Sequence, residues 1–413
     1  DGSFAFAGEA ATERAGSGGS LNGQKTVPMD IAFKDATGTK EINYPIFSEK
    51  PTQTKYKKLR LRNSGDDYQE AHLRDQFWQA TGIEAKLAPS ASEPVQVFAN
   101  GAYIGMYDLR EKEDETLVES SFGVDKDTVQ YLSDAKVLGG EGTVASYDAM
   151  YAYISGNSMA TPANYAKAKT LLDMESFAQD FALHMFSLNR DWPQKNLHMF
   201  RMPSYDGTWR FRPHDFDISS DGTNAWGSNT TTSRSMNDKY GTTYRPSVMI
   251  RALLANPEFK RLYANIVADQ LNTVFAPVES QARLDAMAAE MAPYIPNQVA
   301  RNGEPTSVAK WTAEVARLRT FLAEREQYYV THTQSYLGLG ARATVTVGVD
   351  DAAHGTVQVS TVNLSTRMTG VGATWTGRYW TGVPVAITAK PKPGFAFAGW
   401  SDGVTEATRS VDP

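Results

Sequence analysis

The residues best suited to chemistry lie in one stretch, from Asn189 to Asp217. Asp191 is followed five residues later by Asn196, and the stretch ends in two acidic residues, Asp215 and Asp217. One carboxylate can orient an attacking hydroxyl, while an amide and a second carboxylate can hold the Mg²⁺ ions that neutralise the phosphates of ATP. These residue types, with either terminal aspartate as the second carboxylate, therefore predict phosphoryl transfer from ATP.

The spacing within this stretch supports the same prediction. Residues 197–201 and 209–213 alternate around a turn at 205–207, which predicts a β-hairpin between the two polar segments. The order resembles that of protein kinases, with two departures: Asn189 stands in place of a usual His, and Asp217 in place of a usual Gly. The alternative interpretation is a polar loop joined to an ordinary hairpin, because Asp and Asn also cap turns.

The elements around this stretch must position it. The segment 174–188 carries an apolar stripe at helical spacing and predicts a buried helix that delivers the loop at Asp191. The segment 130–170 is interpreted as loops with a polar helix near 164–172. The polar segment 219–245 is too long for a simple connection, which is typical of a functional lid or of disorder. Four helices are predicted next, at 248–254, 257–275, 278–291 and 307–336.

The first 125 residues are mostly predicted strands around one helix. Strands are expected at 29–33 and 58–62, and a helix at 70–81 that stops at Gly82. The pair Asn100-Gly101 predicts a tight turn between the strands 95–98 and 103–109. A short helix should close at Gly123, and Arg110 and Glu111 end the preceding strand.

The N-terminal 24 residues are rich in Gly, Ala and Ser, and Lys25 follows them directly. A glycine turn and a lysine at the start of a strand can contact phosphate. The alternative is a flexible lead-in with an exposed edge lysine, since no G-x-G-x-x-G pattern is present.

Composition limits the class of protein. The 413 residues are 41% hydrophobic and 21% charged, enough for a globular chain with a sizeable core, and two or three domains are expected. The net charge of -6 without a long basic run argues against a nucleic-acid-binding surface. The absence of Cys excludes disulfides and thiolate metal sites. The sequence has no run of about 18 apolar residues, so no transmembrane segment is predicted. The first residue is Asp1, which suggests a processed or trimmed chain whose signal peptide has been removed.

A boundary is predicted at residues 338–340, after which the chain becomes rich in Thr and Val. Short alternating strands at 344–349, 355–359 and 383–389, with a final PGFAFAGWSDG, predict a small β module. About 70 residues remain, few enough for an incomplete module.

Several strings in register resemble the spore-coat CotH kinase family, an atypical protein-kinase-like fold, across roughly residues 15–340. They are QKT around Lys25, LRNSGDD at Leu61–Asp67 with the following LRDQF, NGAYIGMYDLREK at Asn100–Lys112, NRDWPQKN at Asn189–Asn196, and DGTWRFRPHDFD at Asp206–Asp217. The C-terminal strands resemble a divergent internalin-type bacterial repeat, similar to a β-grasp module.

This resemblance implies a role for each matching residue. Asp191 is implied as the catalytic carboxylate, and Asn196 as a catalytic residue that ligates metal or phosphate. Asp215 and Asp217 are implied as the Mg²⁺ (or Mn²⁺) site, with the choice between them open. The implied ATP-contacting and supporting residues are Lys25, Arg62, Arg110 and Glu111, with Glu111 expected to orient a basic residue.

The resemblance also implies the architecture. The expected fold is α+β, a two-lobed kinase-like domain at 1–340 followed by a small β-rich repeat module at 341–413. Within the first domain, a β-rich lobe is expected at about 1–125 and an α-rich lobe at about 126–340.

The implied function is a secreted or cell-surface, Mg²⁺-dependent kinase that phosphorylates Ser or Thr of extracellular or coat proteins. One alternative is a surface adhesin or scaffold with a degenerate kinase fold, and another is transfer of a different group, such as AMP. A cell-surface or wall partner is expected to bind through the C-terminal module.

Overall fold

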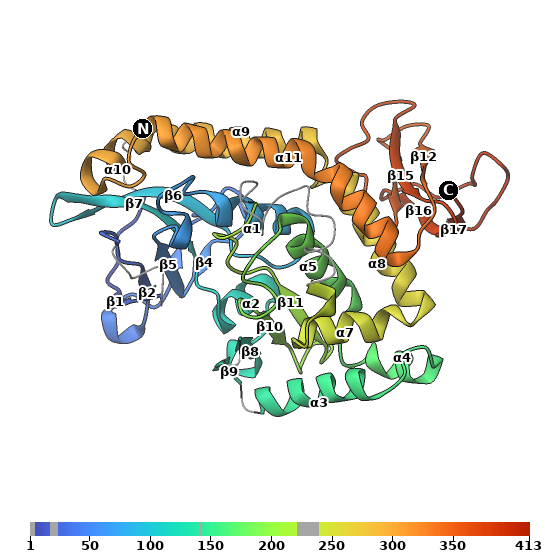
Figure 1. The fold of residues 1–413 in the computed structure, drawn as a ribbon, viewed down its shortest axis with the longest axis horizontal. Helices are drawn as coiled ribbons and strands as arrows, with labels where there is room; N and C mark the ends of the chain where they lie inside the picture. The colour runs from blue at the N-terminus through green and yellow to red at the C-terminus, as the bar shows by residue number, and fades with distance from the viewer. Residues whose placement is uncertain (1–4, 17–23, 135, 141, 221–238) are drawn as a thin grey trace.

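The computed structural model describes residues 5–16, 24–134, 136–140, 142–220 and 239–413. It has a mixed α+β fold in which helices pack around several small antiparallel sheets (Figure 1). The expected α+β class is therefore confirmed. Most of the predicted lid at 219–245 and the glycine-rich part of the lead-in, 17–23, lie outside the described residues.

A five-stranded antiparallel sheet occupies the N-terminal part, with the strand order β1-β2-β5-β7-β6. The predicted hairpin β6–β7 is confirmed, and its turn residues Asn100 and Gly101 have φ angles of 50° and 80°. The predicted strands at 29–33 and 58–62 are present as β2 and β5. The bounds are β1 Ala11–Arg14, β2 Met29–Ala32, β5 Lys58–Arg62, β6 Ser92–Ala99 and β7 Ala102–Glu111.

The two faces of this sheet differ in character. Arg62 lies opposite Asp108 and Arg60 lies opposite Arg110, so one face is lined with charged side chains. The other face carries Leu59, which packs with Phe33 and the residues of a small two-stranded sheet, β3 (Ile42–Asn43) and β4 (Lys55–Tyr56). Consecutive residues of a strand point to opposite faces, so neighbouring site candidates on β7 are separated by the sheet.

The helix predicted at 70–81 is shifted along the chain. Helix α1 spans Arg74–Glu84 and follows a 3₁₀ turn at Gly65–Asp67. The predicted stop, Gly82, lies inside the helix, where a Cβ would stand 3.0 Å from the Pro213 Cγ. Glycine is therefore present for close packing against the chain after β11, rather than to end the helix.

A second sheet follows, with the order β11-β10-β8-β9. The predicted hairpin is confirmed as β10 (His198–Arg201) and β11 (Trp209–Arg212). The polar helix expected near 164–172 is present as α4 (Pro162–Ala168). The interpretation of the rest of 130–170 as loops was wrong, because it contains β8 (Gln130–Ser133), β9 (Lys136–Gly139) and α3 (Thr143–Gly156). β8 pairs with β10, which is distant in sequence, so this pairing leaves no local signal in the sequence.

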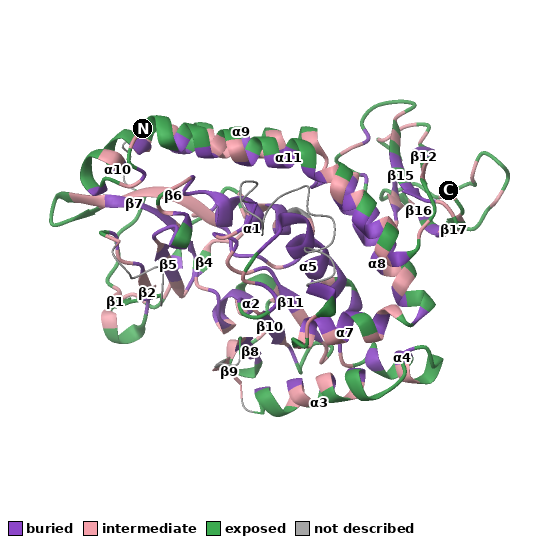
Figure 2. Ribbon diagram, viewed as in Figure 1, coloured by how far each residue is buried: buried purple, intermediate pink, exposed green. Residues whose placement is uncertain are grey.

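Helix α5 (Met174–Ser187) lies at the centre of the molecule, and every residue from Phe177 to Ser187 is buried (Figure 2). The predicted buried helix is thus confirmed, and the loop that follows it starts from a rigid position. The predicted short helix is α2 (Glu115–Phe122), which ends at Gly123 as expected. The remaining helices are α7 (Arg245–Leu254), α8 (Pro257–Leu271), α9 (Pro277–Met291), α11 (Val308–Leu337) and α10 (Ile295–Asn302), which was not predicted.

The C-terminal strands begin at Arg342, after α11 ends at Leu337. One pair is β12 (Arg342–Gly348) with β15 (Thr374–Trp380), and the other sheet has the order β14-β13-β16-β17. Its strands are β13 Gly355–Val359, β14 Val362–Asn363, β16 Val385–Pro391 and β17 Thr408–Val411. The PGFAFAGWSDG segment is not a strand.

These strands dock on α8. Asp269 accepts hydrogen bonds from the Thr361 backbone N–H (2.9 Å), the Thr361 hydroxyl (2.8 Å) and the Tyr379 hydroxyl (2.7 Å). Asn272, which caps the C-terminal end of α8, exchanges hydrogen bonds with the Arg378 backbone. Among the described residues, no helix has the length and apolar character needed to cross a lipid bilayer.

Candidate active site

Two loops meet at the end of α5. The first runs from Asn189 to Asn196, after Leu188 has ended the helix in a left-handed conformation. The Asn189 side chain accepts from the Asp191 backbone N–H (3.2 Å) and donates to the Asp215 carbonyl oxygen (2.8 Å). One amide side chain thus joins the predicted catalytic loop to the acidic segment.

The acidic segment follows β11, and the carboxylates of Asp215 and Asp217 both point at the guanidinium of Arg62. The Arg62 Nη2 lies 2.5 Å from the Asp215 Oδ1 and 3.0 Å from the Asp217 Oδ2. Asp217 Oδ2 also accepts a hydrogen bond from the Asp66 backbone N–H at 2.8 Å. A Cβ at Gly65 would lie 1.9 Å from that same oxygen, so only glycine fits beneath it. This contact explains the glycine of the LRNSGDD string.

The two carboxyl groups differ in acidity. Burial opposes the ionisation of Asp215, but the Arg62 guanidinium outweighs it and lowers the pKa of Asp215. Burial and the charge of Asp215 together raise the pKa of Asp217 well above its usual range. A second positive charge near this pair would hold both groups ionised.

The predicted catalytic residues lie beside this pair. Asn196 is buried with a φ of 62°, and its side-chain nitrogen lies 3.4 Å from the Asp215 carbonyl oxygen. Asp191 is half-buried, and its Oδ2 lies 2.7 Å from the Lys195 Nζ. The pKa of Asp66 is raised by burial and by the charges of Asp215 and Asp191, so these carboxylates share one electrostatic environment. The structure therefore brings Asp191, Asn196, Asp215 and Asp217 together.

This donor set fits a hard divalent cation. Mg²⁺ and Mn²⁺ prefer carboxylate and amide oxygens, and two carboxylate oxygens already converge on a positive group here. Asp215 and Asp217 would hold the ion, with Asn196 as the neighbouring amide.

Three nearly parallel rings join α5 to the predicted catalytic loop and to the acidic segment. His184 of α5 stacks between Trp192 (centroids 4.6 Å apart, 4° between planes) and Phe216 (4.5 Å, 9°). Burial lowers the pKa of His184 well below its usual range, so the ring is neutral. Lys239, a residue that the sequence analysis did not select, donates to the carbonyl oxygens of Asn189 and Trp192.

Two predicted ATP-contacting residues, Arg62 and Arg110, belong to one buried charge network. Arg110 is fully buried, and it pairs with Asp108 and, at 2.6 Å, with the Asp75 Oδ2. Arg62 contacts the acidic pair directly and lies 3.7 Å from the same Asp75 oxygen. Arg110 therefore supports Asp75 from within the core rather than lining the site.

Asp75, at the start of α1, was missed by the sequence analysis. Its Oδ1 accepts a hydrogen bond from the Phe216 backbone N–H at 2.7 Å, so it also holds the acidic segment. The LRDQF string that contains it offered a signal, but the helix was predicted from its apolar residues alone. Glu111, which was expected to orient a basic residue, does pair with Lys50, but it does so away from the acidic pair.

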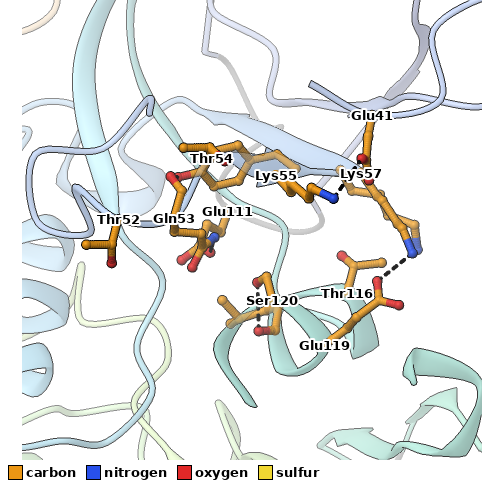
Figure 3. Close-up of a pocket in the computed structure, with 13 residues that line it drawn as sticks. Glu41, Thr52, Gln53, Thr54, Lys55, Lys57, Glu111, Thr116, Glu119 and Ser120 are labelled. Atoms are coloured by element: carbon orange, nitrogen blue, oxygen red, sulfur yellow. Dashed lines mark hydrogen bonds and ion pairs between the residues drawn. The ribbon is translucent and has the colours of Figure 1, made fainter. Parts of the chain in front are cut away.

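Glu111 lies on the opposite face of the sheet. It pairs with Lys50 at 2.5 Å and accepts from Gln53 Nε2 at 2.5 Å. It lines a pocket of about 470 Å³ between the β3–β4 sheet and α2, where the Lys57–Glu119 pair is also seen (Figure 3). The alternation of β7 separates this pocket from the site that holds Arg62.

Lys25 is also placed away from the acidic pair. It is exposed and lines a pocket of about 190 Å³ with Gln298, Asn302 and Gly303, next to α10. Its neighbour Gln24 donates to the Gly65 carbonyl oxygen at 2.9 Å. The QKT string therefore reaches the site through Gln24 rather than through Lys25.

Within the described ranges, one set of three His or acidic side chains has its ligand atoms within 4.8 Å of one another, and it is Glu113, His198 and His214. The Arg212 guanidinium lies 3.2 Å from Glu113 and 3.4 Å from His198, and Ser133 and Tyr131 hydrogen bond to the His198 ring. The buried guanidinium of Arg212 already occupies the space between these side chains. The rings of His198 and His214 stack face to face, with centroids 3.6 Å apart, instead of pointing toward one common position. We therefore assign it a structural role.

Comparison with known proteins identifies the family of the chain. The profile of the protein family described as CotH kinase protein matches residues 30–329. This range contains Asp191, Asn196, Asp215 and Asp217. No protein in the curated set matches the chain.

Proposed function

The chain belongs to the CotH kinase protein family, and from that premise we propose that it transfers the γ-phosphoryl group of ATP to a Ser or Thr hydroxyl of a protein. The observation that carries the proposal is the convergence of Asp191, Asn196, Asp215 and Asp217 at the end of α5, joined by the Asn189 side chain. A polar loop joined to an ordinary hairpin has no need of this arrangement.

Asp191 is proposed to orient the acceptor hydroxyl. In the transfer, the acceptor oxygen forms a bond to the γ-phosphorus, the bond from that phosphorus to the ADP oxygen breaks, and the acceptor proton passes to the Asp191 carboxylate. Lys195, 2.7 Å away, restrains that carboxylate. Mg²⁺ or Mn²⁺ held by Asp215, Asp217 and Asn196 would neutralise phosphate charge.

The charged face of the N-terminal sheet is proposed to cover the nucleotide, with α1 beside it and with α5 and α7 to α11 forming the second lobe of a two-lobed kinase. Lys25 would itself have to move to contact phosphate there, because it lines a separate pocket next to α10. The C-terminal strands are proposed to be an internalin-type repeat that binds a cell-surface or wall partner. The protein substrate is proposed to be extracellular or a coat protein, which agrees with a secreted or surface location.

The test is label transfer from γ-labelled ATP with Mg²⁺ or Mn²⁺ to a generic acceptor protein or to the chain itself, beside Asp191→Ala. Label that is lost in the variant, with ATP binding retained, is the expected result. A mass gain of adenylyl size without γ-label would redirect the mechanism to AMP transfer. Absence of both, together with no stabilisation by ATP and Mg²⁺, would favour a surface adhesin or scaffold.

A further inference from the structure

The acidic pair and its arginine form part of a larger buried charge network. Asp215 and Asp217 face Arg62, Arg62 faces Asp75, and Asp75 faces Arg110, which also pairs with Asp108. With all carboxyls ionised, these four aspartates and two arginines leave two negative charges. That deficit equals the charge of one divalent cation.

Arg62 is placed where a metal ion would be needed. A single nitrogen, Nη2, takes an oxygen from each carboxylate, which is the bridging position that a cation between Asp215 and Asp217 would occupy. A guanidinium and a divalent cation cannot both lie there, because like charges repel and the oxygens have limited lone pairs. Metal binding therefore requires Arg62 to give up at least one of these contacts.

A second acceptor for Arg62 is already in place. The Asp75 Oδ2 lies 3.7 Å from the Arg62 Nη1, longer than a charge-assisted hydrogen bond of roughly 2.7–2.9 Å. This buried oxygen already lies 2.6 Å from the Arg110 Nη1, but that ion pair lacks hydrogen-bond geometry, and a carboxylate oxygen has two lone pairs. Within the described residues, the Arg62 Nε donates no hydrogen bond. A movement of about 1 Å would turn the ion pair of Arg62 with Asp75 into a hydrogen bond.

We propose that Arg62 is the resident counter-cation of the Asp215–Asp217 pair, that a divalent metal displaces it, and that Asp75 then receives it. The inference rests on the proposed metal site and adds a residue that controls it. Arg62 is here a competitor for the ion's ligands, so its charge sets the metal affinity. Arg110 and Asp108 hold Asp75 in place from the core side.

The test measures the binding of Mn²⁺ alone, without nucleotide, by electron paramagnetic resonance of the free ion. Arg62→Met should lower the Kd for Mn²⁺ by roughly tenfold or more, because the competing charge is removed. Asp75→Asn should raise the Kd, because the displaced arginine loses its acceptor. In the double variant the Asp75→Asn effect should disappear.

Arg60→Met is the matched control. Arg60 lies on the same face of β5, and it pairs with Asp30 at 2.6 Å rather than with the acidic pair. Its replacement should leave the Kd for Mn²⁺ unchanged. If Arg60→Met lowers the Kd for Mn²⁺ as much as Arg62→Met does, the effect is one of net charge and the inference is overturned. Unchanged or weaker Mn²⁺ binding by a folded Arg62→Met variant would also overturn it.

Two further measurements keep the outcomes separate. If the wild type and Asp215→Asn bind Mn²⁺ equally, the proposed metal site itself is wrong. If Arg62→Met does not fold, the Arg62 Nε resonance of the wild type is followed by NMR during Mg²⁺ titration, with Arg62→Lys used to assign it. A shift that saturates with metal binding is expected, and a constant resonance would overturn the proposal.

Discussion

The side chain of Asn189 donates a hydrogen bond to the backbone carbonyl of Asp215 over 2.8 Å. The acceptor belongs to the segment that carries the acidic pair, and the donor lies two residues before Asp191. A neutral amide therefore fixes the distance between the proposed catalytic carboxylate and the proposed metal ligands.

Replacing this amide should separate the two loops. Asn189→Ala is expected to lower kcat by roughly 10–100-fold, the range for groups that hold metal ligands in place, while KM for ATP changes little. Steady-state kinetics measures this split, and thermal unfolding checks that the fold survives. An Asn189→Ala variant with unchanged kcat would show that the loops are held by other contacts, such as those of Lys239.

The second prediction concerns Gly65. Gly65→Ala should destabilise the protein by more than the roughly 1–2 kcal/mol that a residue with φ of 56° costs, because the new Cβ would also clash with the Asp217 Oδ2 at 1.9 Å. Gly101→Ala is the matched control, since Gly101 has a φ of 80° and open space around it. Thermal or denaturant unfolding of both variants isolates the contribution of the clash. Equal losses of unfolding free energy in the two variants would contradict the predicted clash.

The third prediction concerns the stacked ring of His184. His184→Ala should cost roughly 3 kcal/mol of stability through the cavity it leaves, and should lower kcat because Trp192 and Phe216 lose their common support. His184→Phe should restore most of both, since the native ring is neutral. His354→Ala, which removes an exposed ring stacked on Phe395, should cost far less. If His184→Phe does not restore kcat, the imidazole nitrogens of His184 contribute to activity beyond the packing of the ring.

The fourth prediction concerns pH. Burial raises the pKa of Asp269 to about 6 from its usual 3.8, so the folded state binds a proton more tightly than the unfolded state. This contribution to stability is complete below about pH 4 and is lost as the pH rises through 6, with an upper limit of about 3 kcal/mol.

Asp269→Asn removes this titration. The unfolding free energy of the variant minus that of the wild type should therefore increase from pH 4.5 to pH 7.5, because only the wild type loses this contribution to stability over this range. Urea unfolding at each pH measures this difference. Comparing the two chains cancels the other buried acids, including Asp67 and Glu49. Parallel profiles would assign the pH dependence to those groups instead.

The sequence predicted the parts of the site that depend on local spacing. Asp191, Asn196 and the acidic pair follow a fixed order around a hairpin, and the helix before them has a clear apolar stripe. Asp75 depends instead on a partner far away in sequence, Arg110 or Arg62, and a single acidic residue at the start of a helix looks like an ordinary first-turn charge.

Glu111 shows what local spacing could have excluded. It was grouped with its neighbour Arg110, yet adjacent residues of a strand point to opposite faces, so both could not have lined one site. Once β7 was predicted as a strand, its alternation alone separated them. The strand β8 was beyond such reasoning, because its pairing with β10 joins segments that are distant in sequence.

Helix α11 has a structural consequence. Its 30 residues extend roughly 45 Å, and Trp311 near its start donates to the Ala71 carbonyl oxygen beside α1. Further along the helix, Glu326 pairs with Arg342 of the first C-terminal strand at 2.9 Å. Helix α11 thus connects the C-terminal strands, through Arg342, to the segment just before the helix that carries Asp75.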